Sequence, residues 1–551
     1  MKTPPLQRID LEMDEIHALL ERARASMEPD DYAKLKALVE TAVYLLAVVE
    51  DKRTTIDRLR KLRFGATSEK TGEVIPPSPA EPSATMPDDA EATRPPRPGH
   101  GRHGADAYDG AEKIVVPHAS LKSGDRCPDC RKGKVYEVAP PGVLVRSVGQ
   151  APVQAKVYEL QKLRCNLCGK VFTAEAPEGV GTEKYDATAA SMIALLKYGS
   201  GLPFNRLEGL QGSLGVPLPA STQWDIVSGT ANVLAPVYEE LIREAAQGQV
   251  LHHDDTTIKI LEFMGQRARP AALAEGGPED AGKKKASQRR GLFTSGIVST
   301  NEGHRIALFF SGRQHAGENL ADVLAHRAKT LVPPIQMCDA LSRNLPAPFE
   351  TLVANCLAHG RRQFVEVVER FPEECRHVLE VLKEVYRNDA LARERDLSPE
   401  ARLQFHQAES GPIMEELQRW CHRQFEDRLV EPNSALGEAI SYMLNHWEKL
   451  TLFLREPGAP LDNNICERIL KRAILHRKNA LFYKTLNGAR VGDLFMSLIH
   501  TCQLNDVNPF EYLTELQRHA ADLAARPANC MPWNYREMLK PADTTTDAHR
   551  G

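Results

Sequence analysis

The sequence predicts a multidomain protein of mixed α/β and α structure, in which a helical segment interrupts an α/β core. With 551 residues, the chain is too long for one ordinary hydrophobic core. Its 42% hydrophobic and 26% charged residues are typical of a globular protein. It contains no run of about 18 apolar residues that would suggest a membrane span. The first residues lack the order of a secretory signal, so we expect a cytoplasmic protein.

The composition shifts along the chain indicate eight parts. We expect an N-terminal helix with a possible coiled coil over 1–70, a flexible linker over 71–106, a zinc ribbon over 107–183, a helix-turn-helix-like helical domain over 184–246, the first part of the α/β core over 247–371, an α-helical insertion over 372–460, the final helices of the core over 461–520 and a C-terminal tail over 521–551.

Residues 32–63 are expected to form one long helix. Apolar residues from Leu38 to Leu59 recur in alternating steps of three and four, which is the spacing of a coiled-coil seam. Such a helix either joins two copies of the chain or packs on its own protein. Lys52 at a seam position would weaken a dimer but define its register. The linker over 71–106 is rich in Pro, Gly and charge.

Four of the eleven cysteines stand in two Cys-x-x-Cys pairs. They are Cys127, Cys130, Cys165 and Cys168. Two such knuckles flanking alternating segments, such as 156–164, can present four thiolates to one Zn²⁺ ion. We therefore expect a structural zinc site, and a redox pair or buried free thiols are the alternatives. The other seven cysteines are scattered among apolar segments, as in proteins of a reducing compartment.

Residues 187–245 contain three helical stretches separated by Gly- and Pro-containing turns, and Ser221 or Thr222 can cap the third. Such a unit is typical of a helix-turn-helix DNA-binding domain. A plain helical spacer is the alternative.

The next region alternates strands and helices. Expected strands cover 250–261, 291–300, 304–312, 333–340 and 351–359, and expected helices cover 316–327 and 360–371. This order is that of a ribonuclease H-like fold, in which the first and fourth strands are neighbours. The helical insertion over 372–460 either braces DNA or a partner subunit, or only packs against the core.

Three acids in this region are candidates for a shared site. Asp254 lies in the first strand, Asp339 ends the fourth, and Glu467 lies in a later helix. Clustered carboxylates can hold two hard cations, Mg²⁺ or Mn²⁺, about 3.5–4 Å apart for phosphodiester chemistry. Asp255, next to Asp254, is the alternative candidate for the acid supplied by the first strand.

The helix that carries Glu467 is strongly basic. Candidate DNA contacts on it are Arg468, Lys471, Arg472, Arg477, Lys478 and Asn463. An ordinary solvated charged face is the alternative.

Several motifs resemble the large transposase subunit of the insertion sequence 66 family. They are LRFGATSEK, CPDC with CNLC, KYGSGLPFNRLEGL, LHHDDTTIKIL, CLAHGRRQF and DNNICERILKRAILHRKN followed by LF, and they span roughly residues 38–515. The resemblance implies a DDE transposase that cleaves DNA at the ends of an insertion sequence and transfers strands into target DNA. It assigns the catalytic, metal-binding triad to Asp254, Asp339 and Glu467.

The same resemblance implies terminal inverted repeats and target DNA as partners. We also expect a homo-oligomer, and accessory proteins of the same element are further candidate partners. Two other readings remain open. A catalytically inactive, transposase-derived protein would only bind DNA, and a ribonuclease H-type nuclease would cut strands without joining them.

Overall fold

The computed structural model describes residues 115–137, 150–164, 166, 171–181, 183–264 and 291–539, together with a few short runs between 20 and 39. The seam residues from Leu38 to Leu59 and the linker over 71–106 lie outside the described residues. The chain divides into two compact units, 1–80 with 361–387 and 81–360 with 388–551. In the first unit, the described residues are chiefly the end of helix α10 (Leu357–Val367) and most of α11 (Pro372–Glu394).

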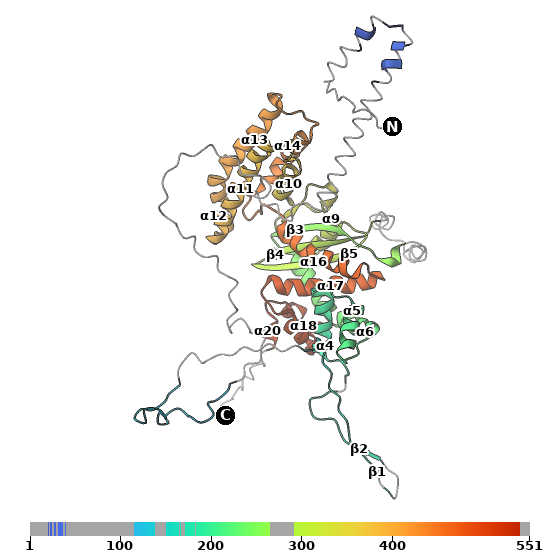
Figure 1. Ribbon diagram of the computed structural model, residues 1–551, viewed down its shortest axis with the longest axis vertical. Coiled ribbons are helices and arrows are strands. Elements are labelled where there is room, and N and C mark those ends of the chain that lie inside the picture. The colour runs from blue at the N-terminus through green and yellow to red at the C-terminus, as the bar shows by residue number, and fades with distance from the viewer. Residues whose placement is uncertain are drawn as a thin grey trace, which may run out of the picture. The chain divides into compact units, whose positions relative to one another are not determined.

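A five-stranded mixed sheet organises the second unit (Figure 1). Its strands are β3 (Val250–Thr257), β4 (Phe293–Asn301), β5 (His304–Gly312), β6 (Ile335–Cys338) and β7 (Leu352–Asn355). The order across the sheet is β5-β4-β3-β6-β7, with β3 antiparallel to β4 and parallel to β6. The first and fourth strands of the region are therefore neighbours, as the sequence predicted.

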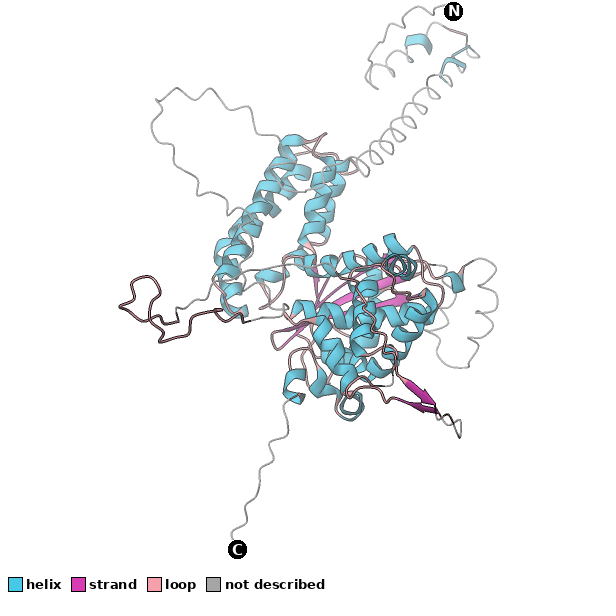
Figure 2. Ribbon diagram, turned by 60° about the horizontal axis from the view of Figure 1, so that its bottom comes forward, coloured by secondary structure: helices cyan, strands magenta, loops and turns pink. Residues whose placement is uncertain are grey.

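Helices account for most of the remaining described residues, and Figure 2 shows them in cyan. They are α4 (Ala187–Ala194) with the π-helical turn Leu195–Gly199, α5 (Phe204–Ser213), α6 (Ala220–Ala246), α9 (Ala316–Leu324), α12 (Pro399–Glu409), α13 (Gly411–Glu426), α14 (Ala435–Asn445), α15 (Trp447–Leu450), α16 (Asn464–Ala480), α17 (Leu486–Leu504), α18 (Pro509–Arg518), α19 (Ala520–Ala525) and α20 (Tyr535–Met538). Short 3₁₀ turns lie at Leu261–Phe263, Ser342–Asn344, Leu452–Leu454 and Pro527–Cys530.

The two faces of the sheet receive different helices because strand residues alternate sides. Gly296 in the middle of β4 faces α16, where a Cβ atom would lie 3.0 Å from Leu470 Cγ. The preceding residue, Ser295, faces α9 and accepts a hydrogen bond of 2.8 Å from Asn319 Nδ2. Helix α16 therefore lies on one face, directly over the centre of the sheet, and α9 lies on the other.

Polar side chains of α17 cover the outer edge of β5. Backbone N–H groups at every second residue of β5 donate to side chains at every fourth residue along the helix. The pairs are Ser311 with Asp493, Phe309 with Ser497, Ala307 with Thr501 and Arg305 with Asn505, at 2.7–3.1 Å. Two strand residues and four helix residues both advance by about 6–7 Å, so the two repeats stay matched. An exposed edge would otherwise offer unpaired groups to another chain.

The helices of 187–246 share one hydrophobic core with the sheet. Leu234 and Leu241 of α6 are fully buried in a cluster that also contains Ile297 and Phe309 of the sheet and Phe495 of α17. These three helices were expected, and they are present. Their buried faces pack on the α/β core.

Several expected helix and strand ends were wrong. The strand expected over 351–359 ends at Asn355, and its last residues belong to α10, which begins at Leu357. The helix over 220–246 begins at Ala220 with Pro219 at its cap position, so Ser221 and Thr222 lie inside its first turn and do not cap it. Strand β3 ends at Thr257, because Ile260 instead forms a bridge with Tyr483 beyond the end of α16.

The region expected to be a C-terminal tail is folded up to residue 539. It contains α19, α20 and the turn Pro527–Cys530, and the side chains of Met531 and Tyr535 are buried in the shared core. The Tyr512 hydroxyl donates to the Cys530 carbonyl at 2.7 Å. Buried aromatic area therefore holds this segment on the protein.

Two glycine substitutions should have opposite effects on stability. Gly296→Ala places a methyl group against Leu470 and should destabilise the protein by about 1–3 kcal/mol, because α16 must move away from the sheet. Gly229→Ala lies in the exposed middle of α6 with open space around it, and should stabilise by about 0.5–1 kcal/mol. Thermal unfolding of both variants measures the difference, and equal shifts would contradict the close packing of α16.

Candidate active site

The pairing of β3 with β6 brings the first two candidate acids together. Val250 pairs with Ile335 and His252 with Met337 in a parallel register. Continuing that register two residues further places Asp254 beside Asp339, which directly follows β6. Adjacent strands lie about 4.8 Å apart, so the two carboxyl groups lie in one neighbourhood at the carboxyl end of β6.

Helix α16 brings the third acid to the same place. Glu467 lies in its first turn, and the helix start is attached to β3 by the residue before it. The Asn463 side chain accepts from His252 Nδ1 at 3.2 Å and donates to the His253 carbonyl at 3.0 Å. The Asn463 backbone N–H also points to Cys356 Sγ at 3.3 Å.

The environment of Asp254 disfavours a negative charge. Burial raises the pKa of its carboxyl group to about 7, and the charges of Asp339, Asp255 and Glu467 act in the same direction. The Asp255 backbone N–H donates to Asp254 Oδ1 at 2.7 Å and partly opposes this effect. Burial also raises the pKa of Asp339, although His359 and Arg343 oppose that shift.

Asp255 faces the other side of the sheet and is engaged by two basic groups. Its Oδ2 atom accepts from His315 Nδ1 at 2.8 Å, and its Oδ1 atom lies 3.7 Å from Arg343 Nη2. The neighbouring Asp254 has no such cation against it among the described side chains. Because consecutive side chains of a strand point to opposite faces, Asp255 lies against cationic partners, whereas Asp254 lies on the side of the other acids.

Asp339 is held by the turn that follows it. The Asn344 side-chain amide donates to Asp339 Oδ1, and the Asn344 carbonyl accepts from Gln336 Nε2 at 2.7 Å. Gln336 Nε2 also lies 2.8 Å from His253 Nε2 on β3. A network of neutral amides therefore ties the second acid to both parallel strands.

Two further residues lie at this site, and the sequence reasoning did not assign them. His359 Nε2 lies 3.7 Å from Glu467 Oε1, and ligand atoms of Cys356, His359 and Glu467 all lie within 4.8 Å of one another. The signal was the Cys-x-x-His spacing inside CLAHGRRQF, which places both side chains at the start of α10. The carboxylate oxygens of Asp254, Asp339 and Glu467 do not all lie within 4.8 Å of one another, as expected for carboxylates whose charges repel.

The basic residues of α16 differ in exposure. Arg468, Lys471, Arg472 and Lys478 are exposed, and within the described part of the chain none of them forms an ion pair. Arg477 is half-buried and donates to Thr256 Oγ1 at 3.1 Å and Thr257 Oγ1 at 3.0 Å, which ties α16 to the end of β3. Asn463 is fully buried and its polar atoms are engaged within the protein, so it does not face a DNA backbone.

One of the two cysteine knuckles is described. Cys127 N–H donates to the Gly133 carbonyl at 2.8 Å, and Gly133 N–H points to Cys130 Sγ at 3.5 Å. The pKa of the exposed Cys130 thiol is lowered, and the hydrogen bond from Gly133 N–H is the largest cause. Cys165 and Cys168 lie outside the described residues, between the short antiparallel strands β1 (Lys162–Arg164) and β2 (Val171–Thr173). The longer strand expected over 156–164 is limited to its last three residues.

The region that contains these acids matches a known family. Residues 184–272 and 282–491, more than half of the chain, match the model of the Transposase IS66 family. The chain belongs to this family. The matched residues include Asp254, Asp339 and Glu467, and membership indicates a protein with a role in DNA transposition.

Relatives of this transposase family member extend over most of its length. The Uncharacterized protein y4jD of Sinorhizobium fredii (strain NBRC 101917 / NGR234) is 26% identical over 512 residues, which cover 89% of this chain and 96% of that protein. The Uncharacterized protein y4hP of the same strain is 25% identical over 71% of this chain and 70% of its own length. No solved structure matches the chain. None of the described helices is long and apolar enough to cross a membrane.

Neutralising the two adjacent acids of β3 should change stability in opposite directions. Because the pKa of Asp254 is raised from 3.8 to about 7, the folded state holds a proton that the unfolded state releases, and stability falls as pH rises between these values. Asp254→Asn should therefore stabilise the metal-free protein at pH 8 by about 1–3 kcal/mol and have little effect near pH 4.

Asp255→Asn is the matched control. It removes the favourable contacts with His315 and Arg343 and should lower the melting temperature at pH 8. Thermal unfolding in the presence of a chelator across pH 4–8 measures both variants. Destabilisation by Asp254→Asn at pH 8 would contradict the charge repulsion inferred at this site.

Proposed function

We propose that the protein is a metal-dependent DDE transposase with a ribonuclease H-like catalytic domain, in which Asp254, Asp339 and Glu467 are the catalytic acids. The convergence of these three residues from β3, the end of β6 and the first turn of α16 carries the proposal. Membership of the Transposase IS66 family supplies the reaction class. Asp254 is preferred to Asp255 because its side chain lies among the other acids and not against His315.

The donor set fits hard divalent cations such as Mg²⁺ or Mn²⁺. All three ligands are carboxylates, and within the described part of the chain Glu467 Oε1 is a buried atom without a hydrogen-bond partner. Burial together with like charges makes this place unfavourable for anions until cations offset them. Two bound ions would supply activation of the attacking oxygen and stabilisation of the leaving oxygen during phosphodiester cleavage and strand transfer.

The protein's own residues hold these acids in place. Asn463 positions the start of α16 on β3, and Asn344 orients the carboxylate of Asp339. We therefore assign Asn463 a positioning role instead of the DNA contact expected from the sequence. His359, beside both Glu467 and the charge of Asp339, is placed to orient Glu467 or to contact the scissile phosphate.

Charge-neutral variants of the acids test the catalytic assignment. Asp254→Asn, Asp339→Asn and Glu467→Gln should each abolish metal-dependent cleavage of duplex DNA that carries the ends flanking the gene, because each removes one carboxylate ligand. DNA binding should persist. Glu239→Gln, an exposed acid on α6, serves as a control that should retain activity.

The products distinguish the alternatives in the same assay. Cut ends that join to target DNA support a transposase, whereas cut ends that are never joined indicate a nuclease. Binding without cleavage by the natural protein would indicate an inactive DNA-binding derivative. Full strand transfer by Glu467→Gln would overturn the assignment of the third acid.

We also propose that the exposed cations of α16 hold the DNA backbone beside the acids. Arg468, Lys471 and Arg472 follow Glu467 within two turns, and a phosphate chain brought to the acids would meet them. A zinc ion held by Cys127, Cys130, Cys165 and Cys168, a homo-oligomer and accessory proteins remain predictions from the sequence.

Replacing Arg468, Lys471 and Arg472 together by Ala should weaken DNA binding and reduce its dependence on salt. Each lost phosphate contact should lower the slope of log affinity against log salt by about 0.9. Titrations at several salt concentrations measure the slope. Arg243→Ala on α6, where the arginine pairs with Glu239 and Glu240, is a control that should leave it unchanged. An unchanged slope in the triple variant would remove α16 from the DNA interface.

A further inference from the structure

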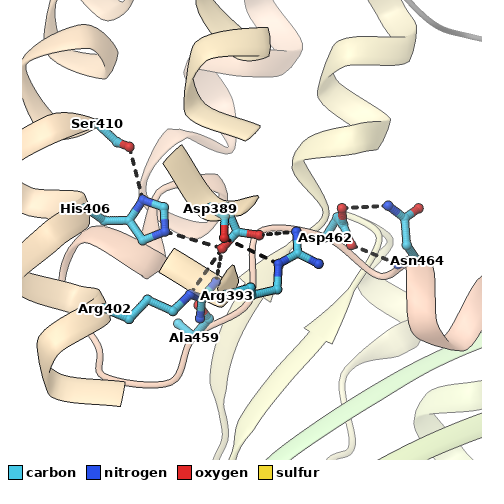
Figure 3. Close-up of polar contacts among 8 residues, drawn as sticks. All are labelled: Asp389, Arg393, Arg402, His406, Ser410, Ala459, Asp462 and Asn464. Carbon is cyan, nitrogen blue, oxygen red and sulfur yellow. Dashed lines mark hydrogen bonds and ion pairs between the residues drawn. The ribbon is translucent and has the colours of Figure 1, made fainter. Parts of the chain in front are cut away.

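Charged side chains of the helical insertion form one compact cluster around a buried carboxylate (Figure 3). At its centre lies Asp389 on α11, which is 5% exposed. Arg402 on α12 donates to Asp389 Oδ1 through Nη2 at 2.7 Å and through Nε at 3.1 Å. Arg393 Nη2 donates to Asp389 Oδ2 at 2.6 Å, and His406 Nε2 lies 3.4 Å from Oδ1.

The cluster keeps Asp389 ionised inside the protein. Burial alone would raise the pKa of this carboxyl group, but the hydrogen bond of His406 and the charge and hydrogen bond of Arg402 outweigh it and lower the pKa to about 2. His406 is oriented in turn by a contact of 3.0 Å between its Nδ1 atom and Ser410 Oγ. Arg402 is therefore held in one orientation by a fixed anion.

Among the described residues Arg402 has one more contact, and it is with the last residues of the insertion. Its Nη1 atom donates to the carbonyl of Ala459 at 3.1 Å. Ala459 begins the segment 459–463, which leads directly into α16. A guanidinium group has donors on several edges of one rigid plane, so a single side chain can bind the carboxylate and this carbonyl at once.

The contacts of segment 459–463 define where α16 starts and therefore where Glu467 lies. The Leu461 carbonyl accepts from Leu357 N–H at 3.0 Å. Asp462 accepts from Asn464 N–H at 3.1 Å, as Figure 3 shows. Asn463 then attaches the helix start to β3, and its carbonyl accepts from Glu467 N–H at 3.1 Å. Ala459, near the end of the insertion, is the residue through which Arg402 binds this segment.

We infer that Arg402, oriented by Asp389, is a positioning residue for Glu467, and that the helical insertion is thereby part of the support of the candidate active site. This inference rests on the proposed function of Glu467. Packing alone does not require an arginine here, because apolar residues often replace a buried ion pair without loss of stability. What Arg402 adds is a directed bond to the Ala459 carbonyl, and displacement of a reacting group by about 1 Å can lower a rate by about 100-fold.

Cleavage kinetics test the inference with two variants of Arg402. Arg402→Met removes both the charge and the bond to Ala459. Arg402→Lys keeps the charge beside Asp389, but one ammonium group lacks the planar fork that spans both partners. The matched control is Arg419→Met on α13, where the exposed arginine pairs with Glu416 at 2.7 Å.

The assay follows single-turnover cleavage of duplex DNA that carries the ends flanking the gene, at several Mg²⁺ concentrations. Arg402→Met should lower the rate constant about 10-fold or more and raise the Mg²⁺ concentration needed for half the maximal rate, with DNA affinity within two-fold of the natural protein. Arg402→Lys should shift both quantities in the same direction by less. Arg419→Met should match the natural protein.

A natural rate and Mg²⁺ dependence in folded Arg402→Met would overturn the inference. If Arg402→Met does not fold, the same two measurements on Arg402→Lys decide it. A loss of rate without any change in Mg²⁺ dependence would also contradict a role through Glu467.

Amide hydrogen exchange provides a readout that does not depend on activity. In Arg402→Met, residues 461–467 should exchange faster than in the natural protein, whereas β5, which α17 covers, should not change. If the natural protein does not cleave DNA, the proposed function fails, yet the exchange rates still show whether Arg402 orders the start of α16. Unchanged exchange at 461–467 would exclude the positioning role by itself.

Discussion

The parallel pairing of β3 with β6 is the constraint on which the candidate site depends. It joins strands that are distant in sequence and places the Asp254 and Asp339 positions side by side. The antiparallel neighbours β4 and β5 complete the sheet on one side, and Gly296 on β4 leaves room for α16 to lie close to the strand that carries Asp254. Without this register, Asp254 and Asp339 would not lie side by side near Glu467.

Charge balance explains why the neighbouring polar groups are arranged as they are. Burial and the charges of Asp339, Asp255 and Glu467 raise the pKa of Asp254, and burial raises the pKa of Asp339, so the metal-free site stores electrostatic repulsion. Asp255, one residue away, is compensated by His315 and Arg343 on the opposite face. In the insertion, Asp389 is compensated by Arg393 and Arg402. Asp254 thus differs from Asp255 and Asp389, because no cation lies against its carboxylate among the described side chains.

The order of strands and helices was predictable because local patterns carry it. Apolar runs of strand length, the helical stretches of 187–245 and the helix formers of 372–460 all correspond to observed elements. Element ends were less predictable. Thr257 ends β3 because a bridge to Tyr483 takes over, and Pro219 precedes α6, so that Ser221 and Thr222 fall inside the helix. Such ends depend on contacts with distant residues, which no local pattern contains.

The sequence by itself determined the family and the basic character of α16 and proposed the three acids, since each is a matter of residue type and spacing. Only the tertiary structure decided which side of β3 each of the two adjacent acids occupies and that Asn463 is buried as a tether for α16. It also decided that His359 lies beside Glu467 and that Arg402 binds the segment that leads into α16. These relations depend on the register between strands and on contacts between residues up to about two hundred positions apart. Spacing along the chain cannot encode them, because a side chain's neighbours are set by packing of the whole fold.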